Sequence, residues 1–540
     1  MPPYYCALLV WALLFVHVSN AAPPQWKYLF PAGGQLGTTV EVEAHGTFDH
    51  WPLQVWIDRP GASVQAQETK GKFTVTVGSD AIPGLYWMRF YDSEGPTPLV
   101  PFIVGTLPEV VEQEPNNSSA KRQELSSPNV IVNGRLQSKG DVDTFAVRLD
   151  EGQTLVADLE AHRTLGSQID ALLEIVSSEG FVLARNHDDQ EIDPRIVFTA
   201  PKSGVYLVRT FGFPATPNSS IVLAGDASIV YRLTLTVQGF LDYSLPLAVS
   251  PEAQQVEAHG WSLPADAQHL IPRILPSSKQ AVLFHPQLAN LLILPIDRHP
   301  SLLANEPSKL AGPQTIELPV TITGRIEEPR DEDSFRFHAK AGETIDVRIE
   351  SRSLGYPLDP VLTVRDAQEK VLSRTDDSGT SRDIQLPVAI AADGEYQFTV
   401  SDLHRHGGPR YVYRLTAAVA RPDFALSLTG DTFKATVGQK VELPVTVARL
   451  NGFKEAINVR VEGLPPGASA EAATSLAEGD SAKAVKLTIT AGDTPFAGPI
   501  RMIGTITDAV AETRVADAPL AGRPQRTTDI WLTIGAAEKK

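Results

Sequence analysis

The sequence predicts an all-β protein built as a string of antiparallel β-sandwich domains, and three observations support this. Apolar and polar residues alternate in many segments, for example 72–77, 231–237 and 344–349, and such alternation gives a strand one buried and one solvated face. Clusters of Gly, Pro, Asn and Asp interrupt these segments at short intervals. No long segment of the sequence has the periodicity and the caps of an amphipathic helix.

The chain has 540 residues, of which 42% are hydrophobic. This length predicts about three or four domains, and the composition lets each of them bury a core. The formal net charge is −17. Nucleic-acid binding depends on Lys and Arg that neutralise phosphates, so this charge argues against a nucleic-acid partner.

The N-terminal residues 4–16 form a short apolar run, and the small residues Ser19 and Ala21 follow it. A transmembrane helix needs about 20 apolar residues, so the run is short for a span. We therefore interpret residues 1–22 as a cleaved signal peptide, although no Lys or Arg precedes the run. This predicts an exported protein, periplasmic or extracellular, with no membrane span after cleavage; an uncleaved anchor is the alternative.

Removal of the signal would also remove Cys6, the only cysteine. The mature chain would then have no disulfide, no zinc–thiolate site and no cysteine nucleophile. An exported protein without disulfides depends on large β cores, on bound ions, or on both.

A segment of the chain occurs twice, and the second copy lies 190 positions after the first. The first copy contains Gly134, Asp141-Val-Asp143-Thr-Phe145 and Gly152-Gln-Thr; the second contains Gly324, Asp331-Glu-Asp333-Ser-Phe335 and Gly342-Glu-Thr. Further parallels extend to Tyr231-Arg-Leu-Thr and Tyr413-Arg-Leu-Thr. A module that is repeated without a catalytic signature is typical of a protein that binds rather than reacts.

The strand and turn signals divide the chain into four modules, which are residues 25–105, the repeats 106–240 and 303–420, and residues 421–537. The Pro-rich stretch 241–302 has no repeat counterpart, and we interpret it as a connector or an inserted portion of a sheet. The opening of the first module, residues 30–42, resembles IPT-type immunoglobulin-like domains. Residues 452–467 of the last module resemble bacterial extracellular immunoglobulin-like domains.

The two repeats resemble the bacterial pre-peptidase C-terminal (PPC) domain family. The resemblance is carried by Glu112-Gln-Glu114-Pro-Asn116-Asn117, by Gly134 with Asp141-Val-Asp143-Thr-Phe145, by Gly152-Gln-Thr and by Ser203-Gly-Val-Tyr206. It implies jelly-roll-like sandwiches. Domains of this family usually accompany secreted proteases, and related domains of clostridial collagenases bind collagen and calcium.

The same resemblance implies a calcium site in the first repeat. Its ligands, carried over position by position, would be Glu112, Glu114, Asn116, Asn117, Asp141 and Asp143. Calcium takes about 6–8 hard oxygen ligands, which carboxylates and amides supply. The alternative is that the first segment is a turn and that the aspartates cap a strand end, because Asn and Asp often bond local backbone.

The second repeat departs from this pattern at its entrance. It reads Ala304-Asn305-Glu306-Pro307-Ser308, so the outer Glu and the Asn after Pro are missing, while Asp331 and Asp333 persist. We expect no tight metal site in this copy.

Catalytic signatures are missing from the sequence, which has no His-Glu-x-x-His, no Gly-x-Ser-x-Gly and no phosphate-binding loop. We interpret the pair His404 and His406 as part of a solvated loop, and the cluster 187–193 as an acidic turn. The aromatic pairs Trp51/Trp56 and Tyr86/Trp87 either offer a stacking platform or fill and flank a core.

The sequence therefore predicts an exported, non-enzymatic, multi-domain protein that binds extracellular protein or polysaccharide. An accessory subunit of a secreted peptidase or of another hydrolase is the alternative. An enzyme with an unrecognised site is a third reading, supported only by the acidic turns and residues 241–302.

Overall fold

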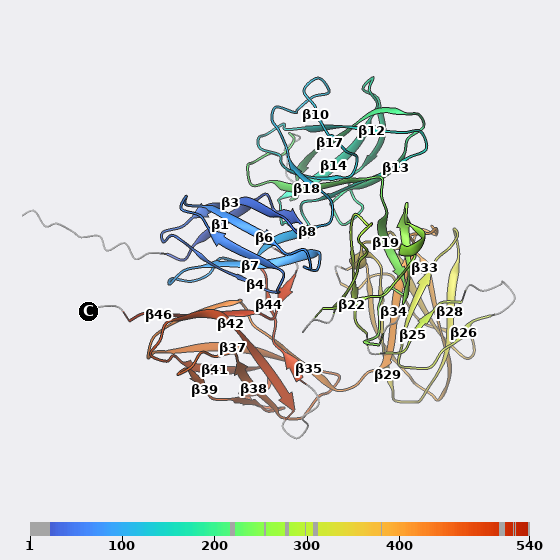
Figure 1. Cartoon of the computed structure of the whole chain (residues 1–540). Helices are drawn as coiled ribbons and strands as arrows, with labels where there is room; N and C mark the ends of the chain where they lie inside the picture. Colours follow the sequence, from blue (N-terminus) through green and yellow to red (C-terminus); the bar gives the residue numbers. More distant parts are fainter. Residues whose placement is uncertain are drawn as a thin grey trace, which may run out of the picture.

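The computed structural model (Figure 1) describes residues 22–216, 222–252, 255–275, 280–297, 299–305, 312–379, 381–506, 513–521, 523 and 525–537. Nearly every element in these ranges is a β-strand, and the helices are single 3-10 turns, which confirms the predicted all-β class. No helix among the described residues is long and apolar enough to cross a membrane. The described residues begin at Ala22, so residues 1–21 of the predicted signal peptide lie outside them.

The first module is a sandwich of two four-stranded sheets, ordered β1-β3-β6-β5 and β2-β8-β7-β4. The alternation in β6 produces this packing, because Phe73, Val75 and Val77 are buried while the residues between them are more exposed. The strands are β1 (Gln25–Phe30), β2 (Gly33–Gln35), β3 (Thr39–Thr47), β4 (Gln54–Ile57), β5 (Ala62–Ala66), β6 (Lys72–Val77), β7 (Gly84–Tyr91) and β8 (Val100–Gly105).

The first repeat is a sandwich of two five-stranded sheets, ordered β10-β12-β17-β14-β15 and β16-β13-β18-β11-β9. Phe145, Leu173, Val208 and Leu233 are among the apolar side chains that meet between the sheets. The strands are β9 (Glu109–Val111), β10 (Gln123–Glu124), β11 (Val130–Arg135), β12 (Asp143–Leu149), β13 (Thr154–Glu160), β14 (Ile169–Val176), β15 (Val182–Asn186), β16 (Arg195–Thr199), β17 (Gly204–Pro214) and β18 (Val230–Thr236).

The second repeat has the same topology, with sheets ordered β26-β28-β33-β30-β31 and β32-β29-β34-β27-β25. Each strand has its counterpart in the first repeat, so the repetition in the sequence is a repetition of one fold. The elements are β25 (Ser301–Leu303), β26 (Gln314–Thr315), β27 (Val320–Arg325), β28 (Glu332–Ala339), β29 (Thr344–Glu350), η2 (Arg352–Leu354), β30 (Pro360–Asp366), β31 (Val371–Thr375), β32 (Ile384–Ala389), β33 (Gly394–Asp402) and β34 (Val412–Val419).

The stretch between the repeats folds into a small β unit of two three-stranded sheets, β19-β20-β21 and β22-β23-β24. It has an apolar core of its own, in which Leu241, Val249, Leu283 and Leu294 are buried. The elements are β19 (Phe240–Leu245), β20 (Val256–Trp261), η1 (Ala265–Ala267), β21 (His269–Leu270), β22 (Arg273–Ile274), β23 (Gln280–Leu283) and β24 (Leu292–Pro295).

The last module packs a sheet ordered β35-β37-β41-β39 against one ordered β36-β46-β42-β38-β40, to which β43 is added beside β42; β44 and β45 form a separate pair. The elements are β35 (Asp423–Ser427), β36 (Thr432–Thr436), β37 (Lys440–Leu450), β38 (Ile457–Glu462), β39 (Ser469–Ala470), β40 (Ala473–Ser475), η3 (Asp480–Ala482), β41 (Ala484–Thr490), β42 (Phe496–Ile506), β43 (Thr513–Val515), β44 (Ala518–Pro519), β45 (Arg526–Thr527) and β46 (Ile530–Gly535).

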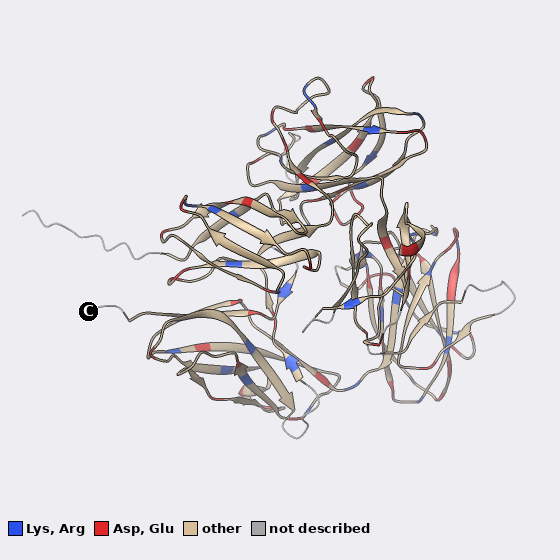
Figure 2. Cartoon of the chain, in the orientation of Figure 1, with Lys and Arg blue, Asp and Glu red and all other residues tan. Residues whose placement is uncertain are grey.

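The modules do not extend in a line, because the last module returns to the first (Figure 1). Trp531 of β46 is fully buried and its ring packs against Trp56 of β4 and Tyr91 of β7. Arg89 of β7 is also fully buried and forms an ion pair with Asp431 of the last module. The chain therefore closes into a ring of modules. Positive and negative side chains are interspersed over all of them (Figure 2).

Candidate metal centre

One end of the first repeat gathers acidic side chains from two separated segments, with a glycine and a tyrosine beside them. Residues 112–117 follow β9, Gly134 lies near the end of β11, and Asp143 begins β12. Strand β18 contributes Tyr231, which is the cross-strand partner of Gly134. The sandwich therefore brings the two segments that carry the family resemblance to one place.

Gly134 is required at this place because a tyrosine ring occupies the space above it. A Cβ atom on Gly134 would lie 2.1 Å from Cζ of Tyr231 and 2.7 Å from Oε2 of Glu112. The second repeat has the same arrangement, since a Cβ on Gly324 would lie 2.3 Å from Cζ of Tyr413. The glycine that recurs in the sequence thus makes room for a buried tyrosine in each copy.

The hydroxyl of Tyr231 connects two of the acidic groups. It donates a hydrogen bond to Oδ2 of Asp143 over 2.5 Å, and Oε2 of Glu112 lies 3.4 Å away. Oε1 of Glu112 accepts a hydrogen bond of 3.2 Å from the side-chain amide of Gln137. Asp143 is fully buried and Glu112 nearly so, so these hydrogen bonds replace part of the water that the two groups lose.

Three carboxylates converge at this point without a cationic partner among the described residues. Glu112, Glu114 and Asp143 each offer an oxygen, and these oxygens lie within 4.8 Å of one another. Asn116 is completely buried beside them, with its backbone N–H donating to Glu114 over 2.9 Å. Its side-chain amide has no hydrogen-bond partner, and neither has Oδ1 of Asp143. Buried polar atoms of this kind are expected to bond an ion or a water molecule.

Burial and mutual repulsion change the protonation of the cluster. Burial, followed by the charge of Glu112, raises the pKa of Asp143 to about 9. Burial also raises the pKa of Glu112, and burial with the neighbouring carboxylates raises the pKa of Tyr231 well above its usual range. Without a cation, the site therefore holds a proton that a metal ion would displace.

Asp141 and Asn117 lie next to the cluster and interact with each other. Oδ1 of Asp141 accepts hydrogen bonds from the side-chain amide of Asn117 over 2.6 Å and from the backbone of Val142 over 3.1 Å. Its Oδ2 accepts from the backbone N–H of Gln137 over 2.6 Å. Asp331 closes the same turn in the second repeat, with both of its oxygens bonded to backbone N–H groups. Asp141 therefore orders the turn that leads to Asp143.

The donor set fits calcium. All the converging groups are carboxylate or amide oxygens, and they come from two segments of loop and strand end, the type of flexible oxygen cage that calcium uses. Glu112, Glu114 and Asp143 would hold the ion, together with the unpartnered Oδ1 of Asn116. Calcium would supply the positive charge that three adjacent carboxylates need in a buried place.

The second repeat keeps the tyrosine and the aspartate but differs at the entrance. Tyr413 donates to Oδ2 of Asp333 over 2.6 Å. The backbone N–H of Ala304 bonds to the strand β27 in the way that the N–H of Glu112 bonds to β11, so Ala304 stands where the first repeat has Glu112. Residues 306–308 of this entrance lie outside the described residues.

Sequence reasoning identified the three converging carboxylates and Asn116 but missed Tyr231 and Gln137. The signal for Tyr231 was present, because Tyr-Arg-Leu-Thr recurs at Tyr413. A cross-strand pair of this kind appears in the sequence as a Gly and a Tyr that recur together, Gly134 with Tyr231 and Gly324 with Tyr413.

The other polar residues that the sequence analysis considered take part in hydrogen bonds that order local loops and turns. The backbone N–H groups of His404 and His406 both donate to Oδ2 of Asp402, while their rings are largely exposed. Asp193 accepts hydrogen bonds from three consecutive backbone N–H groups, those of residues 161–163.

The aromatic pairs of the first module are occupied within the chain. Trp51 packs on Phe73 in the core, and Tyr86 is fully buried. Trp56 lies against Trp531, and the guanidinium of Arg523 lies 5.3 Å from the ring centre of Trp87. Two of these four rings thus fill the core, and the other two contact the last module.

Comparison with known proteins supports the resemblance in the second repeat. Residues 331–402 match the model of the bacterial pre-peptidase C-terminal domain. A probable subtilase-type serine protease of Deinococcus radiodurans is 39% identical over 75 residues, which are 14% of this chain and 10% of that protein. The chain therefore spans only a tenth of the length of this relative.

Solved structures with some likeness include the pre-peptidase C-terminal domain of a Bacillus anthracis collagenase, at 16% identity. The match covers 21% of this chain and 98% of that one, with a TM-score of 0.17. The fibronectin(III)-like modules of CbhA from Clostridium thermocellum match at 10% identity, over 43% of this chain and 95% of that one, with a TM-score of 0.14. In the second repeat, residues 331–402 constitute a bacterial pre-peptidase C-terminal domain.

Proposed function

We propose that the chain is an exported, non-enzymatic protein that binds extracellular protein or polysaccharide through two PPC-like modules, the first of which is organised by calcium. The convergence of Glu112, Glu114 and Asp143, with the unpartnered amide of Asn116, carries the calcium part of this proposal. The shared topology of the two repeats supports a second PPC-like copy.

Calcium would act on the entrance of the first repeat. Residues 112–117 leave the short strand β9, while Asp143 belongs to the central strand β12. An ion between them would close a loop of about thirty residues and fix the entrance segment to the sandwich. The segment would then present a fixed surface to a partner.

Several modules on one chain would favour binding to extended targets. Each weak site adds to the total affinity when its spacing matches the target, and the ring keeps the two repeats in a fixed relation. The ion pair between Arg410 of the second repeat and Asp189 of the first, at 2.7 Å, contributes to this. Fibrous proteins and polysaccharides offer such repeated binding positions.

A second candidate function is an accessory subunit of a secreted peptidase or other hydrolase. It is favoured by the similarity of 75 residues of the chain to a probable subtilase-type protease. Copurification of a peptidase with the tagged chain from its native host would support this function. Repeated purifications without a peptidase would favour the first function, the binding of extracellular protein or polysaccharide.

The calcium proposal is tested by calorimetric titration of the full chain after chelator treatment. We expect one calcium ion per chain, and we expect Glu114→Gln to weaken binding at least tenfold. Glu179→Gln is the matched control, because Glu179 is a fully exposed carboxylate of the same repeat. Equal binding by both variants, or no heat at millimolar calcium, would contradict the proposal.

The binding proposal is tested by cosedimentation of the full chain with insoluble collagen, cellulose and chitin, with calcium and with chelator. We expect retention on at least one matrix, reduced by chelator. Incubation of the same matrices with the protein should release no peptide or sugar. Release of product would instead show an enzyme.

A further inference from the structure

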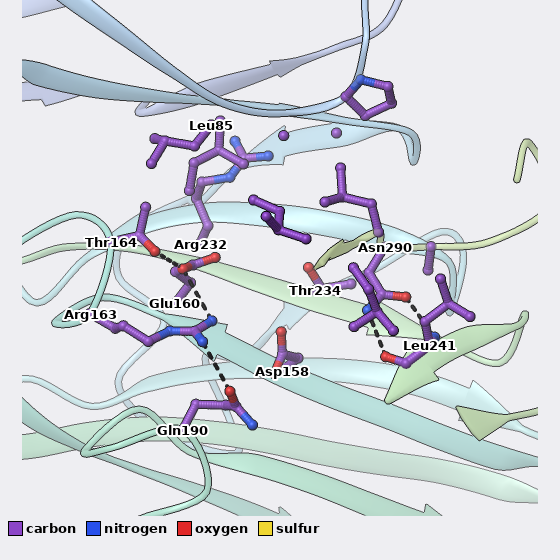
Figure 3. A pocket seen from close by; sticks show the side chains of 18 of the residues that line it. Leu85, Asp158, Glu160, Arg163, Thr164, Gln190, Arg232, Thr234, Leu241 and Asn290 are labelled. Carbon is purple, nitrogen blue, oxygen red and sulfur yellow. Dashed lines mark hydrogen bonds and ion pairs between the residues drawn. The ribbon is translucent and has the colours of Figure 1, made fainter. Parts of the chain in front are cut away.

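The modules meet around a cavity of about 440 Å³ that shares no residue with the candidate metal centre (Figure 3). Strand β7 and the end of β8 in the first module form one wall, and β13 and β18 of the first repeat form another. The small β unit contributes β24, the second repeat contributes Tyr356, and the last module contributes Gln525. A volume of this size lies in the range of small-molecule and peptide side-chain sites.

The cavity has an apolar part lined by aliphatic side chains. Leu85 of the first module lies at one side, and Leu241 of the small β unit lies at the other (Figure 3). Ile103, Leu291 and Leu294 add to this surface. Tyr356 is the one aromatic side chain of its lining within the described residues. An aliphatic surface with so little aromatic area suits an aliphatic group better than a sugar ring, which stacks on aromatic faces.

The polar part of the cavity is close to electrically neutral, because its charged side chains are paired. Arg195 bonds Asp158 over 2.7 Å, and Arg232 bonds Glu109 over 2.8 Å. Arg163 lies 3.5 Å from Glu160. This balance selects neither a phosphate nor a polyamine, and it favours an uncharged ligand.

Two buried polar atoms in this part have no hydrogen-bond partner. They are Nε of Arg163, a donor, and the side-chain oxygen of Gln525, an acceptor. The two residues are adjacent, since the side-chain amide of Gln525 donates to the backbone oxygen of Arg163 over 3.1 Å. The same guanidinium group is held in place by Gln190, whose side-chain oxygen accepts a hydrogen bond of 2.9 Å from Nη1 of Arg163 (Figure 3). An unpaired donor and an unpaired acceptor match the carbonyl and the N–H of peptide groups.

We propose that this cavity binds an uncharged peptide segment with an aliphatic side chain. The side chain would enter the space between Leu85 and Leu241, while a backbone carbonyl accepts from Nε of Arg163 and a backbone N–H donates to Gln525. Solvent reaches this side of the cavity, because the side chains of Arg163 and Glu160 are 38% and 25% exposed. The proposal does not depend on calcium, because the two sites have no residue in common.

The proposal is tested with the full chain and three probes, acetyl-Leu-Leu-amide, acetyl-Asp-Asp-amide and cellobiose, by saturation-transfer NMR in chelator. We expect transfer to the leucine methyl groups only. Leu85→Trp, which fills the cavity, should weaken this binding at least tenfold. Leu372→Trp is the matched control, because Leu372 is an exposed leucine on β31 of the second repeat; it should bind as the unmodified protein does.

A second variant covers the case in which Leu85→Trp fails to fold. Gln525→Met keeps the length of the side chain but removes the acceptor, together with the amide that donates to the backbone oxygen of Arg163. It should weaken binding of acetyl-Leu-Leu-amide by about threefold or more, the cost of the hydrogen bond that the ligand loses. Transfer that is unchanged in Leu85→Trp and Gln525→Met overturns the proposal. So does transfer to cellobiose or to the aspartyl peptide alone, or the lack of transfer to all three probes.

Discussion

The hydroxyl of Tyr231 lies 2.5 Å from Oδ2 of Asp143, and both groups are buried beside a second carboxylate, Glu112. The hydrogen bond between Tyr231 and Asp143 therefore contributes to both the calcium-free and the calcium-bound state of the site. Without an ion, the tyrosine hydrogen bond and a retained proton satisfy Asp143; with an ion, the same hydrogen bond orients its carboxylate. The next two predictions separate these states.

Replacement of Asp143 by Asn should abolish the calcium response and stabilise the calcium-free protein. The amide oxygen can still accept from Tyr231, but no charge has to be buried. We expect no calcium-dependent shift of the unfolding temperature. In chelator at pH 8, the free energy of unfolding should rise by about 1 kcal/mol or more, since one unit of pKa displacement corresponds to about 1.4 kcal/mol.

Asp333→Asn is the control for this experiment, because Asp333 bonds Tyr413 in the second repeat as Asp143 bonds Tyr231. It should leave the calcium response intact. Thermal and denaturant unfolding followed by far-UV circular dichroism measure both variants, because neither repeat contains a tryptophan. A calcium shift that survives in Asp143→Asn would place the ion elsewhere.

The stability of the calcium-free protein should depend on pH through Asp143. Its pKa is raised to about 9 in the folded chain, against about 4 when unfolded. The folded state then binds a proton that the unfolded state releases, so this contribution is complete below about pH 4 and is lost as the pH rises toward 9. The difference in free energy of unfolding between the unmodified protein and Asp143→Asn should follow this curve.

Addition of saturating calcium should flatten that difference curve at its alkaline end, because the ion replaces the proton as the partner of the carboxylates. A difference that is constant between pH 5 and pH 9 in chelator would contradict the raised pKa.

Replacement of Gly134 by Ala should destabilise the first repeat by about 2 kcal/mol or more. The added Cβ would meet the ring of Tyr231 at 2.1 Å, and relief of such a contact displaces a fully buried side chain. Gly204→Ala is the matched control, since Gly204 also lies in a strand of this repeat and a Cβ there would meet nothing within 4 Å. Thermal unfolding should separate the two variants clearly.

Replacement of Asp431 by Ala should open the ring of modules. It leaves Arg89 buried without its carboxylate, and the removal of one partner of a buried ion pair costs about 3–5 kcal/mol. Small-angle X-ray scattering should show a larger radius of gyration. Glu442→Gln, which breaks the exposed pair with Lys486, should change neither the radius nor the stability. An unchanged radius in Asp431→Ala would contradict this prediction and would mean that the other contacts of the last module, such as those of Trp531 and Arg523, are sufficient to keep the ring closed.

The fold class could be read from the sequence because alternation is a local property, and strands such as β6 and β29 show it within seven residues. The acidic cluster could be predicted for a different reason, since both of its segments belong to the residue pattern that resembles the PPC family. The small β unit was harder to predict, because strands as short as β21 and β22, of two residues each, leave no periodicity. No local pattern in the sequence predicts the closure of the ring, because Arg89 and Asp431, which contact each other across it, are 342 positions apart.

The cavity between the modules was unpredictable for the same reason. No sequence pattern connects the residues that line it, because they belong to different modules; examples are Leu85, Arg163, Leu241 and Gln525. Only the docking of complete modules brings them together.

Closure of the ring also joins residues that are synthesised at different times. Trp56 and Arg89 are synthesised before Trp531 and Asp431, which cover them, and Arg89 and Asp431 are 342 positions apart. Until residues 421–537 are made, the module of residues 25–105 exposes the indole ring of Trp56 and the guanidinium of Arg89 without its carboxylate partner. We expect chaperones to bind this exposed surface during that interval and to be released when Trp531 and Asp431 cover it.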